Sequence, residues 1–165
     1  MNYTRESIRN MKTKASAGNQ ATGKLFKSLK KLRPKILDEL FHESHAREFA
    51  RIDCLSCANC CKTTSPAMYD SDVSRMAKAM KLKRPEFIDR YLRLDEDNEY
   101  VFKSIPCPFL RDDNYCIVYD SRPKACREYP HTDRRRMHQI LDLTARNARI
   151  CPAVFNIVRQ LQKQY

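Results

Sequence analysis

Four cysteines fall within eight consecutive residues of this chain, between residues 54 and 61. The stretch reads Cys-Leu-Ser-Cys-Ala-Asn-Cys-Cys, so two of its thiols are adjacent. Core packing explains such a cluster poorly, because cysteine is uncommon and neighbouring side chains rarely share one core position. Thiols spaced two residues apart can turn back toward one soft cation, and a third thiol at the same interval can join them. The cluster therefore predicts a bound metal ion or an iron–sulfur centre.

Four further cysteines follow, which gives eight thiols in 165 residues. A zinc ion takes four thiolates, so eight cysteines would supply two such sets, and a [4Fe–4S] cluster also takes four. One recurring arrangement for that cluster is C-x2-C-x2-C followed by Cys-Pro, which Cys107-Pro108 and Cys151-Pro152 provide at a distance. We expect zinc or an iron–sulfur cluster as the cofactor. The predicted metal ligands are Cys54, Cys57, Cys60, Cys61, Cys107, Cys116, Cys126 and Cys151.

The adjacent thiols of Cys60 and Cys61 leave the grouping of these ligands open. Neighbouring side chains tend to point apart, so the two thiols would serve two sites more easily, or one would only support a ligand. The spacing groups Cys54 and Cys57 with Cys60, and the fourth ligand of that group lies among the later cysteines. A cysteine between apolar neighbours, such as Cys116, can also be a small buried hydrophobe.

The histidines are weaker ligand candidates than the cysteines. His42 and His45 lie one helical turn apart, which suits a metal but is also common on ordinary helix surfaces. His131 follows Cys126 closely in the sequence and is the better candidate.

The chain begins without the apolar segment of a signal peptide, and it has no run of roughly 20 apolar residues that could span a membrane. We therefore expect a cytoplasmic protein with no membrane span. Thiols stay reduced in the cytoplasm, and this favours metal ligation over four disulfides, although the even number of cysteines would permit them.

The chain is strongly basic, with a formal net charge of +12. Such a charge attracts nucleic acid or anionic lipid in a weak and nonspecific way, and Lys24, Lys27, Lys30 and Lys31 concentrate it in the N-terminal region. A solvated surface that keeps the protein soluble explains the charge equally simply, and we favour that explanation.

The apolar pattern predicts an α+β fold that is predominantly α. Residues 1–23 are polar, with a linker at residues 16–20, and predict a flexible basic arm. From residue 24 apolar residues recur at helical intervals, and Pro34 predicts two helices or one kinked helix before the cysteine cluster. We place a helical metal-binding domain at residues 24–165, with the cysteine motifs between residues 54 and 151.

Four later helices are expected, beginning at residue 71 or 72, at Pro85, near Pro123 and at Pro152. Residues 100–103 and 115–119 are rich in aromatic and β-branched side chains and predict two short strands that form a hairpin, with a turn at residues 111–114 between them. A bound metal would staple these small elements together.

The chain offers little that indicates catalysis. Its two glycines, Gly18 and Gly23, cannot form a G-x-G-x-x-G loop or a P-loop. No H-E-x-x-H motif, paired carboxylates or Ser/His/Asp set can be identified, and abundant thiols indicate closed metal sites. We expect a metal-binding protein with no evident catalytic role, and catalytic residues stay unassigned.

Several motifs fall in one order along the chain: Cys54-x2-Cys57-x2-Cys60-Cys61, Cys107-Pro108-Phe109-Leu110, Cys116-Ile117-Val118-Tyr119 and Arg122-Pro123-x2-Cys126-Arg127-x-Tyr129-Pro130. As a set they resemble the YkgJ-like cysteine-cluster family (CxxCxxCC), a zinc- or iron-chelating domain. The resemblance implies metal or iron–sulfur binding at the matched cysteines. A related cluster occurs in flagellin lysine methylases, so an iron–sulfur redox or methyl-transfer-associated enzyme is one alternative. A basic nucleic-acid-binding module with a structural metal is another.

Two arginines lie close to the later cysteines. Four thiolates around Zn²⁺ leave a net negative charge, which the guanidinium of Arg122 or Arg127 would offset. Both side chains could instead be surface groups that donate hydrogen bonds to carbonyls at a helix end.

Overall fold

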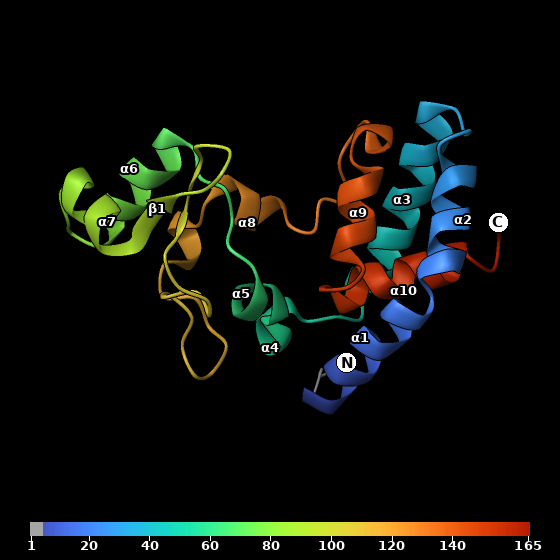
Figure 1. Ribbon diagram of the computed structural model, residues 1–165, viewed down its shortest axis with the longest axis horizontal. Coiled ribbons are helices and arrows are strands. Elements are labelled where there is room, and N and C mark those ends of the chain that lie inside the picture. The colour runs from blue at the N-terminus through green and yellow to red at the C-terminus, as the bar shows by residue number, and fades with distance from the viewer. Residues whose placement is uncertain (1–4) are drawn as a thin grey trace. The chain divides into compact units, whose positions relative to one another are not determined.

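The chain is described by a computed structural model that covers residues 5–165 (Figure 1). Residues 1–4 of the predicted arm lie outside the described residues. The structure is 58% helical and has one two-stranded antiparallel sheet, which confirms an α+β fold that is predominantly α. The chain divides into two compact units: unit 1 comprises Met1–Cys57 and Pro130–Tyr165, and unit 2 comprises Ala58–Tyr129. No described helix combines the length and the apolar content needed to cross a membrane.

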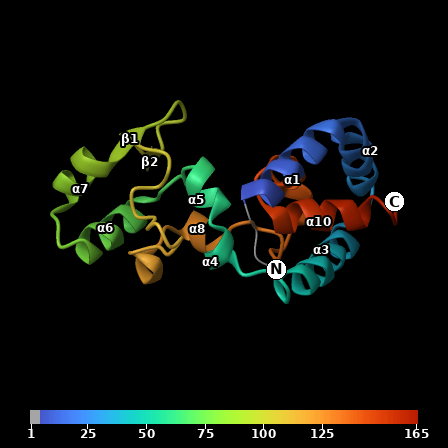
Figure 2. The same cartoon turned by 90° about the horizontal axis from the view of Figure 1, so that it is seen from below.

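Unit 1 is built from helices that come from both ends of the chain (Figures 1 and 2). They are α1 (Arg5–Ala17), α2 (Asn19–Leu29), α3 (Pro34–Phe49), α4 (Cys54–Cys57), α9 (Leu141–Asn147) and α10 (Pro152–Leu161), with a 3₁₀ turn η2 (Met137–Gln139). Pro34 occupies the first turn of α3, so the expected break gives two helices here. The final helix begins at Pro152 as predicted.

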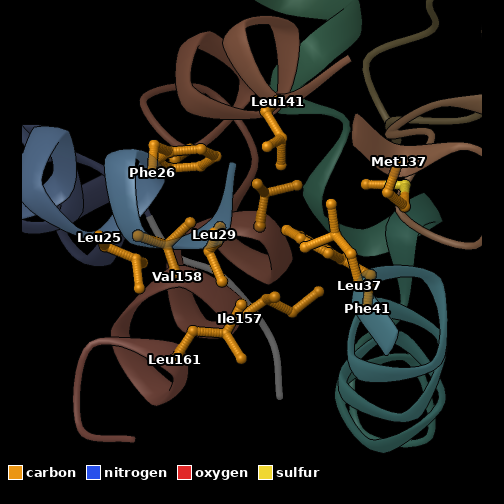
Figure 3. Close-up of a cluster of buried hydrophobic side chains, with 12 residues drawn as sticks. Leu25, Phe26, Leu29, Leu37, Phe41, Met137, Leu141, Ile157, Val158 and Leu161 are labelled. Carbon is orange, nitrogen blue, oxygen red and sulfur yellow. The ribbon is translucent and has the colours of Figure 1, made fainter. Parts of the chain in front are cut away.

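The core of unit 1 is a cluster of aliphatic and aromatic side chains between α2, α3, α9 and α10 (Figure 3). Leu29 and Leu37 are fully buried there, as are Phe41 and Ile157. The helical spacing of these residues in the sequence places them on one face of each helix, and burying that face supplies most of the stability of such short helices.

The linker expected at residues 16–20 is wrong in extent, because α1 continues to Ala17 and α2 begins at Asn19. Backbone hydrogen bonds carry the chain through the junction: the Gly18 N–H donates to Lys14 O at 3.0 Å, and the Thr22 N–H donates to Gly18 O at 2.9 Å. Glycine and asparagine are poor helix formers, but the contact of α1 with α10 and the burial of Met11 outweigh that preference.

Polar side chains of α3 fasten the loop that precedes α9. Asp38 accepts hydrogen bonds from the N–H groups of Arg136 and Met137, both at 2.8 Å. His42 and His45 bond to Arg134 O at 2.9 Å and Thr132 Oγ1 at 2.8 Å. The two histidines therefore connect a helix to a loop within unit 1.

Unit 2 holds the remaining elements: α5 (Asn59–Thr63), α6 (Asp70–Ala79), α7 (Arg84–Tyr91), β1 (Leu92–Leu94), β2 (Tyr100–Phe102), a 3₁₀ turn η1 (Tyr119–Ser121) and α8 (Lys124–Glu128). The helices expected from Pro85 and from Pro123 are confirmed. The core packs Val73 and Met76 of α6 against Phe87 and Phe109. Asp72, predicted as a possible helix cap, lies in the first turn of α6 and accepts a hydrogen bond from the Tyr69 N–H at 3.2 Å.

The two strands pair differently from the expected hairpin. β2 forms at residues 100–102 as predicted, but its antiparallel partner is β1, with Leu92 opposite Phe102. Residues 115–119 form only an isolated bridge between Leu110 and Cys116, after which the chain enters η1. The turn at residues 111–114 is present, with the Asn114 N–H donating to Arg111 O at 3.0 Å.

Candidate metal centre

Backbone hydrogen bonds in unit 2 place Cys61 beside Cys107. Cys61 lies in α5, and its carbonyl accepts a hydrogen bond of 2.8 Å from the Cys107 N–H. The Cys107 carbonyl in turn accepts from the Leu110 N–H at 3.1 Å. Two cysteines that are 46 residues apart in the sequence are thus connected through the main chain, which orients them independently of any metal.

The loop that follows brings Cys116 to the same region. The bridge between Leu110 and Cys116, together with the Ile117 N–H bond to Phe109 O at 3.0 Å, folds residues 115–117 back along residues 109–111. Cys107 and Cys116 both pack against the apolar core of unit 2. Cys116 is therefore partly a packing residue, as the sequence allowed, and it is also a neighbour of other thiols.

Cys126 is presented by α8, whose start is fixed by a buried carboxylate. Asp72 is 1% exposed, forms an ion pair with Arg75, and accepts a hydrogen bond of 3.1 Å from the Lys124 N–H. Arg75 also donates to Arg122 O at 2.8 Å. This network connects α6 to the helix that carries Cys126.

Cys61 carries an unusually acidic thiol, whereas the pKa values of Cys107, Cys116 and Cys126 are raised. The sulfurs of Cys60 and Cys61 lie 3.9 Å apart. The pKa of Cys61 is lowered to about 7, mainly by a hydrogen bond from Cys60 and also by the positive charges of Arg122 and Lys62, which together outweigh the opposing effect of burial. A pKa near 7 makes the thiolate, which is the form that binds metals, well populated at neutral pH.

The pKa values of three other unit 2 thiols are shifted in the opposite direction, upward. Burial raises the pKa of Cys107 to about 11 and that of Cys126 to about 12, and it also raises the pKa of Cys116. In each case the negative charge on Cys61 adds to the increase. Thiolates that lie close together repel one another, and a bound cation would remove that repulsion.

Arg122 lies within this group of thiols. Its charge lowers the pKa of Cys61 and acts in the same direction on Cys116 and Cys126, where burial dominates. Its Nε donates to Tyr119 O at 2.7 Å, and its guanidinium carbon lies 3.4 Å from the centroid of the Tyr119 ring. Arg127 donates to Arg122 O at 3.0 Å. Arg122 therefore influences the thiols through its charge and donates a hydrogen bond to a carbonyl. Arg127 donates its hydrogen bond to a carbonyl.

The remaining cysteines belong to unit 1. Cys54 is exposed and Cys57 is buried, both in α4, while Cys151 precedes α10 and packs against the apolar core. Burial raises the pKa of Cys151 to about 12, and the charges of Cys54 and Cys57 contribute to the increase. We refer to these three as the unit 1 thiols. The C-x2-C-x2-C-C motif is therefore divided between the two units, with the boundary after Cys57.

All eight cysteines are free thiols, so the donor chemistry suits a soft metal. Within residues 5–165, however, no three side chains of His, Cys, Asp or Glu are already arranged closely enough to hold a metal ion. Bound metal would have to draw the sulfurs together by rotation of their side chains. The imidazoles of His42 and His45 hydrogen bond to a loop within unit 1.

Sequence reasoning missed two features of this region. The grouping of Cys61 with the later cysteines was not apparent, because it depends on the hydrogen bond between Cys61 and Cys107. The role of Asp72 in fixing α8 was also missed, and nothing in the local sequence connects residue 72 with residue 124. The proline after Arg122 did predict the helix that carries Cys126.

Eight free thiols in a small, predominantly helical fold place the chain in the class of cysteine-rich proteins. The family model CxxCxxCC, described as "Putative zinc- or iron-chelating domain", matches residues 53–152. The chain belongs to this family, which confirms the resemblance seen in its motifs. Neither a curated protein nor a solved structure gives a significant match to the chain.

Proposed function

We propose that unit 2 binds a metal through four thiolates, those of Cys61, Cys107, Cys116 and Cys126. The observation that carries this proposal is the main-chain hydrogen bond from the Cys107 N–H to Cys61 O at 2.8 Å, and the charge on Cys61 acts on each of the other three thiols. Family membership supports metal binding in general. Cys60, whose thiol contacts Cys61, would then assist by donating a hydrogen bond to the ligating sulfur.

The unit 1 thiols Cys54, Cys57 and Cys151 form a second ligand set in this proposal. Their mutual charge effect supports that grouping. All eight predicted cysteines thus keep a role, divided between the units. A reducing compartment such as the cytoplasm would keep these thiols free.

Both zinc and a [4Fe–4S] cluster take four thiolates, so the donor set of unit 2 suits either. Protein purified without oxygen distinguishes them. Brown protein with broad visible absorption and bound iron and sulfide supports the cluster, and colourless protein with bound zinc supports the ion. Protein that carries neither metal after expression in medium supplemented with both would overturn the proposal.

The ligand assignment is tested by Cys126→Ser, with Cys151→Ser as the matched control in unit 1. Cys126→Ser should weaken metal binding in unit 2 by more than the 10- to 100-fold that loss of a supporting residue costs in typical metal sites. Metal content and competition with a coloured chelator measure this. Cys151→Ser should leave the unit 2 metal in place. Full metal content in Cys126→Ser would contradict the assignment.

Arg122→Gln tests the supporting role of the guanidinium. We expect metal affinity to fall by about 10- to 100-fold, because the thiolates lose a positive charge that acts on Cys61, Cys116 and Cys126. Arg127→Gln is the matched control, since the recorded bond of Arg127 is to a carbonyl. Equal effects of the two substitutions would contradict a specific role for Arg122.

A further inference from the structure

Unit 1 contains a cavity of about 500 Å³ that is separate from the metal proposal, because none of the described residues that line it is a cysteine. It lies among α1, α2, α9 and α10, and we call it the basic pocket. Its volume falls within the roughly 300–1,000 Å³ that is usual for small-molecule sites.

The floor of the basic pocket is apolar. Phe26 of α2 and Val158 of α10 line it, and both belong to the buried core (Figure 3). Phe155, Ala145 and Ala148 complete this surface. The floor is therefore continuous with well-packed side chains, and Phe155 is its partly exposed aromatic residue.

The rim of the pocket is strongly cationic. Six basic side chains line the cavity, and all are exposed at the surface: Lys14, Lys27, Lys30, Arg146, Arg149 and Arg159. Asp142 is the one carboxylate among the described lining residues, and it pairs with Lys30 at 3.0 Å. An excess of five positive charges around one cavity suits a ligand with several negative charges better than one with a single carboxylate.

Gly23 lies beside an open part of the pocket. It lines the pocket from within α2, where glycine costs about 0.8–1.0 kcal/mol relative to alanine. A Cβ atom at this position would meet nothing within 4 Å, so the packing of the protein does not require glycine here. Its effect is to leave that part of the cavity open.

Two polar side chains lie between the floor and the rim. Gln162 Nε2 donates to Thr22 Oγ1 at 3.2 Å, and both residues line the cavity. The Gln162 carbonyl oxygen and the Thr22 hydroxyl group can both form hydrogen bonds to a ligand, which suits the edge of a heterocyclic base.

We infer that the basic pocket binds a nucleotide unit, either free or within single-stranded RNA. The cationic rim would hold the phosphates, because guanidinium and ammonium groups form charge-assisted hydrogen bonds to phosphate oxygens. The base would lie on the floor beside Phe26 and Phe155, since bases stack on aromatic side chains with little regard to sequence. This inference goes beyond metal binding and is independent of it.

Binding is measured with the full chain at about 150 mM salt, by titration with ATP, adenosine, inorganic tripolyphosphate and a six-nucleotide single-stranded RNA. We expect ATP or the RNA to bind at least tenfold more tightly than adenosine and than tripolyphosphate, because the site needs both phosphate and base. Tighter binding of ATP assigns a free nucleotide, and tighter binding of the RNA assigns a strand. Equal binding of tripolyphosphate and ATP, or no binding of either nucleotide probe at this salt, overturns the inference.

Gly23→Leu places a side chain in the open part of the cavity, and we expect it to weaken nucleotide binding at least tenfold. Gly23→Ala is the matched control, because its single methyl group leaves most of the cavity free and improves the helix. Thermal unfolding checks that both variants fold. Unchanged binding by folded Gly23→Leu overturns the inference.

Asp142→Asn tests the inference through an expected increase in nucleotide affinity. Removing the single carboxylate from the rim releases Lys30 and should tighten nucleotide binding about threefold, whereas Arg146→Gln should weaken it about tenfold. Metal content should stay unchanged in both variants, so failure here leaves the metal proposal untouched. If both substitutions leave the affinity unchanged, the phosphates are not held by this rim and the inference fails.

Discussion

Unit 1 and unit 2 both carry cysteines, but they differ in size and in how much regular helix supports the fold around them. Among the described residues, the main apolar cluster of unit 1 contains twelve buried side chains, mostly from regular helices of 7 to 16 residues. The unit 2 core contains nine, and much of its chain between residues 103 and 123 is loop. Unit 2 also carries five of the eight thiols. A small unit with long loops depends more on metal or on buried polar contacts than a helical bundle does.

The largest expected effect that would sharpen this comparison is that of metal removal. Metal that binds only the folded state at 1,000 times its dissociation constant contributes about 4 kcal/mol. Chelation should therefore abolish the protection of unit 2 backbone amides against hydrogen exchange, while α3 and α10 of unit 1 keep theirs. Protein refilled with metal is the control. Equal loss of protection in both units would show that their stabilities do not differ in this way.

A second, smaller effect is expected at Asp72. Its carboxylate is buried, forms an ion pair with Arg75, and accepts hydrogen bonds from the Tyr69 and Lys124 N–H groups. Asp72→Ala leaves those groups without their partner, and breaking a buried ion pair typically costs 3–5 kcal/mol, so we expect a loss of about 3 kcal/mol in unit 2. Chemical unfolding followed by hydrogen exchange measures it.

Because Asp72 fixes the start of α8, metal affinity should fall together with stability in Asp72→Ala. Asp70→Ala is the matched control on the same helix, since Asp70 is 81% exposed. A stable Asp72→Ala variant with normal metal affinity would remove the connection between the ion-pair network and Cys126.

The smallest effect concerns Asp38. Its carboxylate accepts backbone hydrogen bonds within unit 1, as that of Asp72 does within unit 2. Burial acts to raise the pKa of Asp38, but the N–H groups of Met137 and Arg136 outweigh it and lower the pKa below its usual value. Asp38 is only half-buried, so Asp38→Asn should cost about 1 kcal/mol, as loss of a helix cap does.

The sign of the pH dependence follows from that lowered pKa. The stabilisation is present above the unfolded pKa of Asp, near 3.9, and is lost as the pH falls through the lower pKa of the folded protein. Thermal unfolding of metal-free wild type and Asp38→Asn should therefore differ at pH 6 and converge near pH 2 to 3. A difference that persists at the lowest pH would contradict this role.

The sequence predicted the elements of this fold where a local signal existed. Pro34, Pro85 and Pro152 each lie in the first turn of a helix, because proline fits that turn without loss of a hydrogen bond. The partner of β2 could not be predicted in the same way. Leu92-Arg93-Leu94 is three residues long and continues the apolar pattern of α7, whereas residues 115–119 have stronger intrinsic strand preference.

A turn signal could have identified the observed hairpin. Asp95 Oδ1 accepts hydrogen bonds from the N–H groups of Asp97 and Glu99, and Asn98 has a φ of 59°. Asp and Asn favour such turns, and the acidic residues 95–99 form the turn that connects β1 with β2.

The candidate site was predictable in composition but not in grouping. The eight cysteines are evident from the sequence, and the family model covers them. The division into two ligand sets that we propose rests on long-range contacts such as the bond from Cys107 N–H to Cys61 O, which no local pattern encodes. The basic pocket was also hidden, because Arg146, Arg149 and Arg159 lie more than 110 residues after Lys27.

The left-handed backbone at Ala58, with a φ of 46°, ends α4 and starts α5 between Cys57 and Cys60. A left-handed conformation is uncommon for residues other than glycine, so alanine holds this junction at a cost in backbone energy. Glycine at position 58 would relieve that cost, whereas a β-branched residue would raise it and loosen the turn that leads into Cys60 and Cys61.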